Sequence, residues 1–276
     1  MEKSTRESGM MATTGIQGVG KTYQNMYIIK DYIKDKFYNK VRGRKVLIMD
    51  TNGEKTKTQF QKNEIDNVVP KTIAVKDIKD WSRTDGGECR RIDAKNVGLE
   101  DKIKIIEYVV ENFRNGMVVL EDINTYILNV THLKEIVSGL VNLRHRAVDV
   151  LISYQSARAV EPRIWQNARW VRMHYQADNI KGKLPNVPMY KIAQILVNNR
   201  YFSGDKRFFV YIFNFANKIE GAFTKEEFKK ACGQFLGSNK KEIKEFAEMY
   251  GSKNIEEAKK MLIEQYYEMY YGNNDK

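Results

Sequence analysis

Residues 15–22 read GIQGVGKT, and this octapeptide constrains the chain more than any other part of its sequence. It is a complete Walker A motif, in which glycines let backbone N–H groups surround phosphates at the N-terminus of a helix. The Lys21 side chain is expected to reach the β- and γ-phosphates of a nucleoside triphosphate, and the Thr22 hydroxyl is expected to bind Mg²⁺. The motif therefore predicts a triphosphate site between a strand and a helix.

The sequence on either side of the motif has the pattern that such a loop requires. Residues 10–14, MMATT, are suited to a short buried strand, and Met26, Ile29 and Ile33 recur at helical spacing after the loop. We therefore expect a nucleoside triphosphate to bind here, with Mg²⁺; the resemblance described below implies that this nucleotide is ATP. The expected nucleotide-binding residues are Gly15, Gln17, Gly18, Val19, Gly20, Lys21, Thr22 and Tyr23.

Two acidic residues follow a second apolar run. Residues 117–120 read MVVL, and Glu121 and Asp122 come directly after them. This pattern is typical of a Walker B motif, because a buried strand delivers its terminal carboxylates to the edge where the phosphate loop lies. We assign Glu121 to the Mg²⁺ side and Asp122 to activation of the attacking water. The Glu-Asp order leaves the exchanged assignment open.

A glutamine stands just beyond a further apolar run. Residues 148–153 predict a strand, and Gln155 follows its end. An amide in this position is able to contact the γ-phosphate or to orient the attacking water. The alternative is a loop residue that is hydrogen-bonded to the backbone.

Strands and helices alternate along the chain, which is typical of an α/β protein. Apolar runs at 45–50, 117–120, 148–153 and 170–175 predict a mainly parallel, doubly wound sheet with the site at the carboxyl ends of its strands. The runs 192–197 and 208–213 predict an antiparallel hairpin that extends this sheet. Residues 55–98 are polar and weakly periodic, so we expect an insertion or a mobile loop there.

The last part of the chain has a helical pattern. Thr224 and Glu227 suit a capping box, and Asn254 is a suitable start for a final helix. We therefore expect a P-loop core at residues 1–218 and a small helical appendage at residues 219–276.

Composition restricts the classes of partner. A net charge of +12 favours a polyanion such as nucleic acid, although lysines that only solvate the surface would give the same number. No apolar run approaches the length of a membrane span, and the first residues do not form a signal peptide, so we expect a cytoplasmic protein without membrane contact. The scattered histidines and two isolated cysteines argue against structural zinc.

The segments GIQGVGKT, VLIMDTNGE, VVLEDIN and LISYQSARAVEPRIWQNARWVRM occur in this order. Together they resemble the FtsK/HerA-type P-loop ATPases, most closely the genome-packaging ATPases of viruses, over roughly residues 9–175. The resemblance implies an ASCE-type P-loop fold and a homo-oligomeric ring of five or six subunits. It also implies that ATP hydrolysis drives translocation of duplex DNA, with a viral portal or capsid protein as a candidate partner.

The resemblance also implies an arginine that completes the active site of the neighbouring subunit. Its position in the family selects Arg146 first and Arg144 second, with Arg158 and Arg163 as weaker candidates. A cation that only complements a helix end is the alternative for Arg146. Two other functions stay open: a phage morphogenesis ATPase like the zonula occludens toxins, and a nucleotide-dependent switch or adaptor with little turnover.

Overall fold

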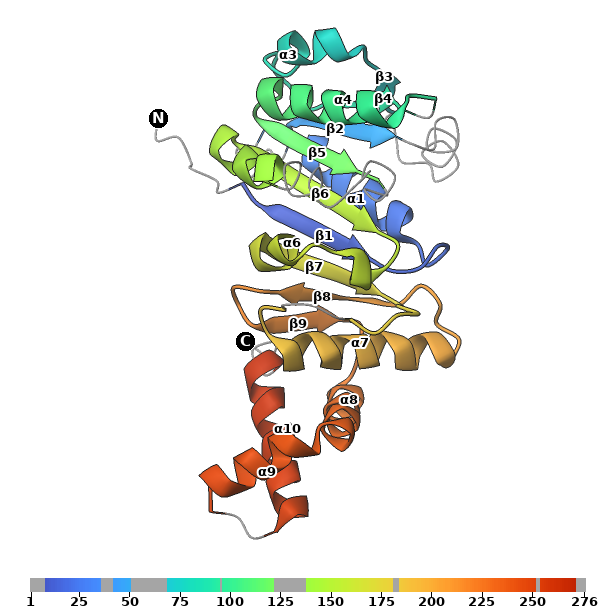
Figure 1. Cartoon of the computed structure of the whole chain (residues 1–276). Coiled ribbons are helices and arrows are strands. Elements are labelled where there is room, and N and C mark those ends of the chain that lie inside the picture. The colour runs from blue at the N-terminus through green and yellow to red at the C-terminus, as the bar shows by residue number, and fades with distance from the viewer. Residues whose placement is uncertain are drawn as a thin grey trace. The chain divides into compact units, whose positions relative to one another are not determined.

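The structure, a computed structural model, describes residues 8–35, 42–50, 69–94, 96–121, 138–180, 184–251 and 254–271. The chain divides into two compact units. The first contains the chain up to Thr13 together with Gly20–Gln155, and the second contains Thr14–Val19 together with Ser156–Lys276. Figure 1 labels the elements of both units.

The first unit is built on a parallel sheet. Its strand order is β3-β4-β2-β5-β6-β1, and the pairs β3–β4, β4–β2, β2–β5 and β5–β6 are all parallel. The register places Leu120 opposite Ile152, so the ends of β5 and β6 lie at one edge. The strands are β1 (Met10–Thr14), β2 (Lys45–Asp50), β3 (Lys71–Thr72), β4 (Cys89–Asp93), β5 (Gly116–Leu120) and β6 (Val148–Tyr154).

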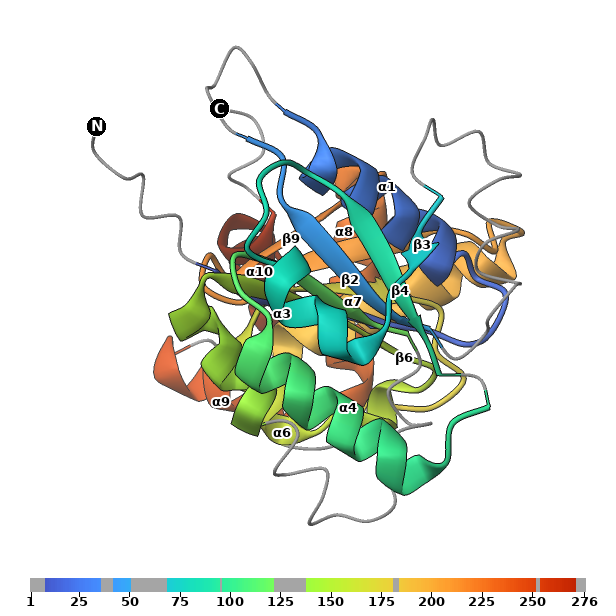
Figure 2. The same cartoon turned by 90° about the horizontal axis from the view of Figure 1, so that it is seen from above.

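Helices cover both faces of this sheet. Figure 2 shows α1 (Lys21–Ile33) on one face around β2 and β4, and α3 (Ile78–Trp81) with α4 (Leu99–Asn112) on the other. All residues of β2, β5 and β6 are consequently buried. This explains why their sequences are continuous apolar runs instead of alternating ones. The doubly wound α/β fold expected from the sequence is confirmed.

The second unit combines an antiparallel sheet with helices. β7 (Ala168–His174) pairs with β8 (Phe209–Phe213), which pairs with β9 (Lys218–Gly221). The helix α7 (Val187–Phe202) packs on these strands, and α8 (Lys225–Ser238) packs on α7. The predicted capping box of Thr224 and Glu227 is formed. The remaining elements are η5 (Ala157–Ala159), α6 (Pro162–Asn167), α9 (Lys240–Met249) and α10 (Ile255–Tyr270).

The predicted hairpin has one wrong strand. The run 192–197 lies inside α7, and the hairpin is formed by β8 and β9 instead. A short apolar run does not distinguish a strand from a buried helix segment by periodicity alone. The residues at the start of α7 do indicate a helix, because the Asn186 side chain accepts a hydrogen bond from the Met189 N–H and Pro188 occupies the first turn.

The range 55–98, for which the sequence predicts an insertion or a mobile loop, contains regular structure where the structure describes it. β4 lies in this range and pairs with β2 inside the sheet. The sequence of β4, CRRID, does not have the apolar pattern of a buried strand, because it contains two arginines. Arg91 is buried nonetheless, since its guanidinium pairs with the Asp50 carboxylate at 2.9 Å. The boundary between residues 218 and 219 stays a prediction.

Among the described residues, no helix combines the length and the apolar character that crossing a membrane requires.

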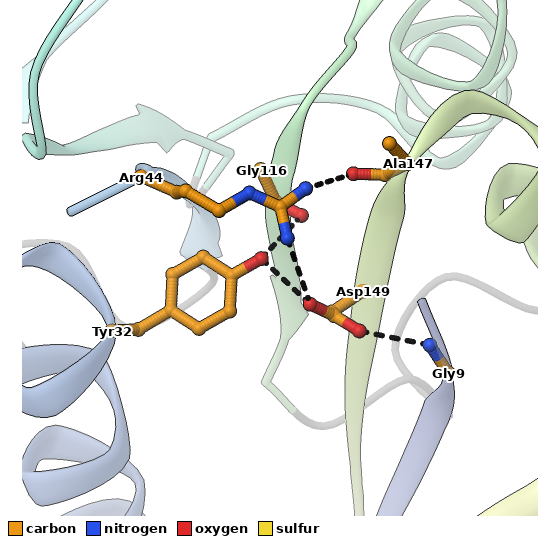
Figure 3. A network of polar contacts seen from close by, with 6 residues as sticks. All are labelled: Gly9, Tyr32, Arg44, Gly116, Ala147 and Asp149. Atoms are coloured by element: carbon orange, nitrogen blue, oxygen red, sulfur yellow. Dashed lines mark hydrogen bonds and ion pairs between the residues drawn. The ribbon is translucent and has the colours of Figure 1, made fainter. Parts of the chain in front are cut away.

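A polar network fastens the amino ends of the strands (Figure 3). The Asp149 carboxylate accepts hydrogen bonds from the Gly9 N–H at 2.8 Å and from the Tyr32 hydroxyl at 2.7 Å. The Arg44 guanidinium lies 3.5 Å from the same carboxylate and also donates to the Ala147 carbonyl. The network therefore joins α1 and the approach to β2 to the starts of β1 and β6, at the edge opposite Glu121.

We predict that Asp149→Ala lowers the free energy of unfolding by about 3 kcal/mol, because it leaves the largely buried Arg44 without its carboxylate. Urea unfolding followed by circular dichroism measures this change. The control is Asp101→Ala, which breaks the exposed Asp101–Lys104 pair and should leave the midpoint nearly unchanged. Equal effects of the two substitutions would contradict this role of Asp149.

Candidate nucleotide-binding site

The first half of the Walker A loop belongs to the second unit and is anchored to the end of β7. The Ile16 N–H donates to the Tyr175 carbonyl at 3.1 Å. Gly15 has a φ of +151°, and a Cβ at this position would lie 2.7 Å from the His174 Cβ. Only glycine fits such a close approach between the loop and β7. The following Gln17 and Gly18 are exposed, whereas Val19 is buried.

The second half of the loop leads into α1 in the first unit. Gly20 is the N-cap of this helix, with a φ of +91°, and it makes no side-chain cap. The first turn contains no acidic residue. An anion is therefore favoured at this helix end by the dipole and by the backbone N–H groups. Lys21 and Thr22 are the first two residues of α1, and Tyr23 follows them.

Glu121 connects α1 to the end of β5. The Thr22 hydroxyl donates to Glu121 Oε2 at 3.1 Å, and the Asn25 amide donates to Glu121 Oε1 at 2.8 Å. Asn25 also donates to the Ser153 hydroxyl at 3.0 Å, which adds β6 to the contact. Asn25 and Glu121 are buried. The carboxylate predicted to serve the metal is thus held beside the hydroxyl predicted to bind it.

The sequence did not single out Asn25 or Ser153. A signal was present for Asn25, because it lies one helical turn after Thr22 and so shares its face of α1. Ser153 is one of the polar residues inside the otherwise apolar run of β6. Neither residue type is specific enough for a role to be assigned without the fold.

The oxygen donors of this site fit Mg²⁺, which prefers hydroxyl, carboxylate, phosphate and water ligands. Thr22 and Glu121 supply two such oxygens side by side. Within the described residues there is no group of three or more His, Cys, Asp and Glu side chains that could hold a metal. A Mg²⁺ ion here would therefore need ligands from a nucleotide and from water.

The remaining predicted catalytic residues do not lie in the contact between Thr22 and Glu121. Gln155 is exposed directly after β6, near the carboxyl edge where Glu121 lies. Asp122 lies outside the described residues. Arg144 and Arg146 belong to η4 (Leu143–Arg146), which precedes β6.

Because β5 and β6 are parallel, Arg146 lies at the opposite edge of the first unit from Glu121. The five paired residues of β6 alone span about 16 Å. Arg146 donates to the Val110 carbonyl at the amino edge. Arg146 is therefore not beside the Glu121 site of the same chain. Arg158 and Arg163, in the second unit, are both exposed.

A cavity of about 240 Å³ opens at this amino edge, and Arg42, Arg44, Lys45 and Asp85 are among the residues that line it. Partial burial and then the positive charges of Arg146 and Arg83 lower the pKa of the Arg114 guanidinium. None of the three forms an ion pair with any residue that the structure describes. The amino edge therefore presents excess positive charge.

Comparison with known proteins gives structural matches only. No family model matches the chain, and no curated protein does. B204, the DNA-packaging ATPase from Sulfolobus turreted icosahedral virus, is 14% identical with a TM-score of 0.50, and the match covers 77% of this chain and 95% of that chain. The genome-packaging NTPase B204 from Sulfolobus turreted icosahedral virus 2, in complex with AMP, is 13% identical with a TM-score of 0.48, covering 78% and 96%.

The N-terminal domain of zonular occludens toxin from Neisseria meningitidis is 16% identical with a TM-score of 0.37, and the match covers 62% of this chain and 78% of that chain. The match to the first B204 structure confirms the P-loop ATPase fold that the motifs predicted. In fold, the chain resembles a viral genome-packaging ATPase.

Proposed function

We propose that this chain is an ATPase that works in a homo-oligomeric ring and couples ATP hydrolysis to the translocation of duplex DNA. The observation that carries the proposal is the contact of Thr22 and Asn25 with Glu121. This contact joins α1, the phosphate-binding helix, to a carboxylate at the carboxyl end of β5. The likeness in fold to a DNA-packaging ATPase supports the choice of DNA as the partner.

Each residue of the site has a chemical task in this proposal. The loop residues 15–20 and the N-terminus of α1 bind the phosphates, and Lys21 neutralises charge on the β- and γ-phosphates. Mg²⁺, when bound with ATP, neutralises further charge on these phosphates. Thr22 and Glu121 would hold that ion, and Asn25 keeps the Glu121 carboxylate oriented.

Hydrolysis requires a positioned water in addition to bound phosphates. Asp122 is the proposed activator of that water, and Gln155 would orient the water or contact the γ-phosphate. The exchanged roles of Glu121 and Asp122 are less favoured, because Glu121 is the residue that contacts Thr22. A viral portal or capsid protein would receive the ring if the chain packages a genome.

Positive charge at the amino edge supports a polyanionic partner. The chain carries a net charge of +12, and Arg83 and Arg114 at the amino edge form no ion pair with any residue that the structure describes. Such charge suits the phosphates of a duplex, whose neutralisation releases counterions. The amino edge is therefore the proposed DNA-contacting surface of the first unit.

We predict that duplex DNA raises the rate of ATP hydrolysis, and that Arg83→Gln with Arg114→Gln weakens this stimulation. Fluorescence anisotropy of labelled duplex across a salt series should give a slope smaller by about 2, one per lost phosphate contact. Lys244→Gln with Lys260→Gln removes the same charge from exposed positions on α9 and α10 and is the control. If the rate of ATP hydrolysis is the same with and without duplex DNA, the translocase proposal is wrong.

The arginine proposed to act in the neighbouring subunit is Arg146. We predict that Arg146→Ala retains ATP binding but hydrolyses ATP roughly 10³-fold more slowly, because the transition-state charge loses its guanidinium. Mixing this variant with Asp122→Ala should restore part of the activity, since some interfaces then combine an intact arginine with an intact acidic site. If the mixture does not recover although both variants assemble, Arg146 is not the arginine in trans, and Arg144 and then Arg158 and Arg163 are the next residues to test.

A further inference from the structure

Aromatic side chains line one face of β8 in the second unit. Phe209, Tyr211 and Phe213 are partly exposed, whereas Val210 and Ile212 between them are fully buried. Because side chains alternate between the two faces of a strand, the three rings share one face and the two aliphatic side chains share the other. The helix α7 packs on β8, and the buried aliphatic face is the one that such a helix covers. The rings therefore lie on the opposite face.

The rings form a connected array across two strands. The ring centroids of Phe209 and Tyr211 lie 5.5 Å apart, and those of Tyr211 and Phe213 lie 6.2 Å apart. Trp170 of β7, the strand beside β8 (Figure 1), meets the Tyr211 ring edge-on at 5.1 Å and is also partly exposed. These four side chains form the aromatic row. Ring pairs at such distances stabilise one another, so the row keeps its shape.

Uncompensated positive charge lies at one end of the aromatic row. Lys206 and Arg207 come directly before β8, both are exposed, and neither forms an ion pair with any residue that the structure describes. Asp205, before them, is exposed as well, so this end keeps one net positive charge. At the other end, Lys218 of β9 pairs with Glu220 at 2.9 Å and adds no net charge.

Partly exposed rings beside unpaired cations fit a single strand of nucleic acid. Bases stack on aromatic side chains, and cations neutralise the phosphates along the strand. A duplex keeps the faces of its bases inside its own stack, whereas a single strand offers a face of every base. An apolar protein surface would cover the rings but would leave Lys206 and Arg207 without a counter-charge. The net charge of +12 on the chain also favours a polyanion.

We propose that the aromatic row, together with Lys206 and Arg207, binds a single strand of nucleic acid. Tyr211 is the central ring, because it contacts the other three rings of the row. Bases stack on the row, and the two cations contact phosphates at its end. All of these residues belong to the second unit. The proposal goes beyond the proposed ATPase function, since it involves neither ATP nor a duplex.

Oligothymidine and a duplex of the same length separate base stacking from charge. By fluorescence anisotropy, Tyr211→Ala is expected to weaken binding of labelled oligothymidine about tenfold, as loss of one base–aromatic stack does. Its affinity for the duplex should equal that of the wild type, because paired bases do not stack on the ring. Tyr211→Phe should bind oligothymidine like the wild type, since it keeps the π-face. Tyr250→Ala is the control, because it removes a ring that is 57% exposed outside the row.

The two cations are tested separately through salt dependence. Lys206→Gln with Arg207→Gln should reduce the salt slope of oligothymidine binding by about 1.4, which is about 0.7 per lost phosphate contact. Lys244→Gln with Lys260→Gln removes the same charge from exposed positions and should leave the slope unchanged. Because Lys206 and Arg207 are exposed, this double variant carries the test if Tyr211→Ala does not fold.

The proposal is overturned if the wild type does not bind oligothymidine, if Tyr211→Ala binds it as tightly as the wild type, or if the double variant keeps the full salt slope. It is also overturned if Tyr211→Ala changes the oligomeric state in sedimentation and leaves oligothymidine binding unchanged, because the row would then be a contact between copies of the chain. None of these measurements uses ATP, so failure of the proposed ATPase function is distinguishable from failure of this site.

Discussion

The hydrogen bonds to Glu121 are the interaction on which the proposed chemistry depends. A carboxylate buried at a strand end is stable only if its oxygens are satisfied, and Thr22 and Asn25 satisfy one oxygen each. The same two bonds fix the start of α1 against β5, and the bond from Asn25 to Ser153 adds β6. The phosphate-binding helix and the acidic strand end therefore hold each other in place.

The two edges of the first unit have different physical tasks. At the carboxyl edge, the helix N-terminus and Glu121 are arranged for phosphates and a cation. At the amino edge, Asp149 collects donors from Gly9, Tyr32 and Arg44 and so fastens strands that are distant in the sequence. This edge also carries the arginines without ion pairs among the described residues. Because the Asp149 network connects the strands at the amino edge, the polar groups at the carboxyl edge are left to bind the nucleotide and its cation.

The sequence predicted those features that neighbouring residues encode, and it did not predict those that depend on residues far apart in the chain. The Walker A loop and strands β2, β5 and β6 were predictable, because glycine spacing and continuous apolar runs report directly on backbone and burial. β4 was missed because its buried Arg91 depends on Asp50, a partner 41 residues away. The run 192–197 was misassigned because a helix covered on both sides looks like a strand. The role of Asn25 needed the fold, since its partners lie on two other elements.

The most direct test of the account compares ATP binding and ATP hydrolysis in Glu121→Gln. Glutamine keeps the shape of the side chain and one acceptor oxygen, but it removes the charge that the metal requires. The account predicts ATP affinity within a few-fold of the wild type, since the loop and α1 are intact, and hydrolysis slower by roughly 100-fold. Wild-type hydrolysis by this variant would contradict the account, because the contact of Glu121 with Thr22 and Asn25 would then be structural alone.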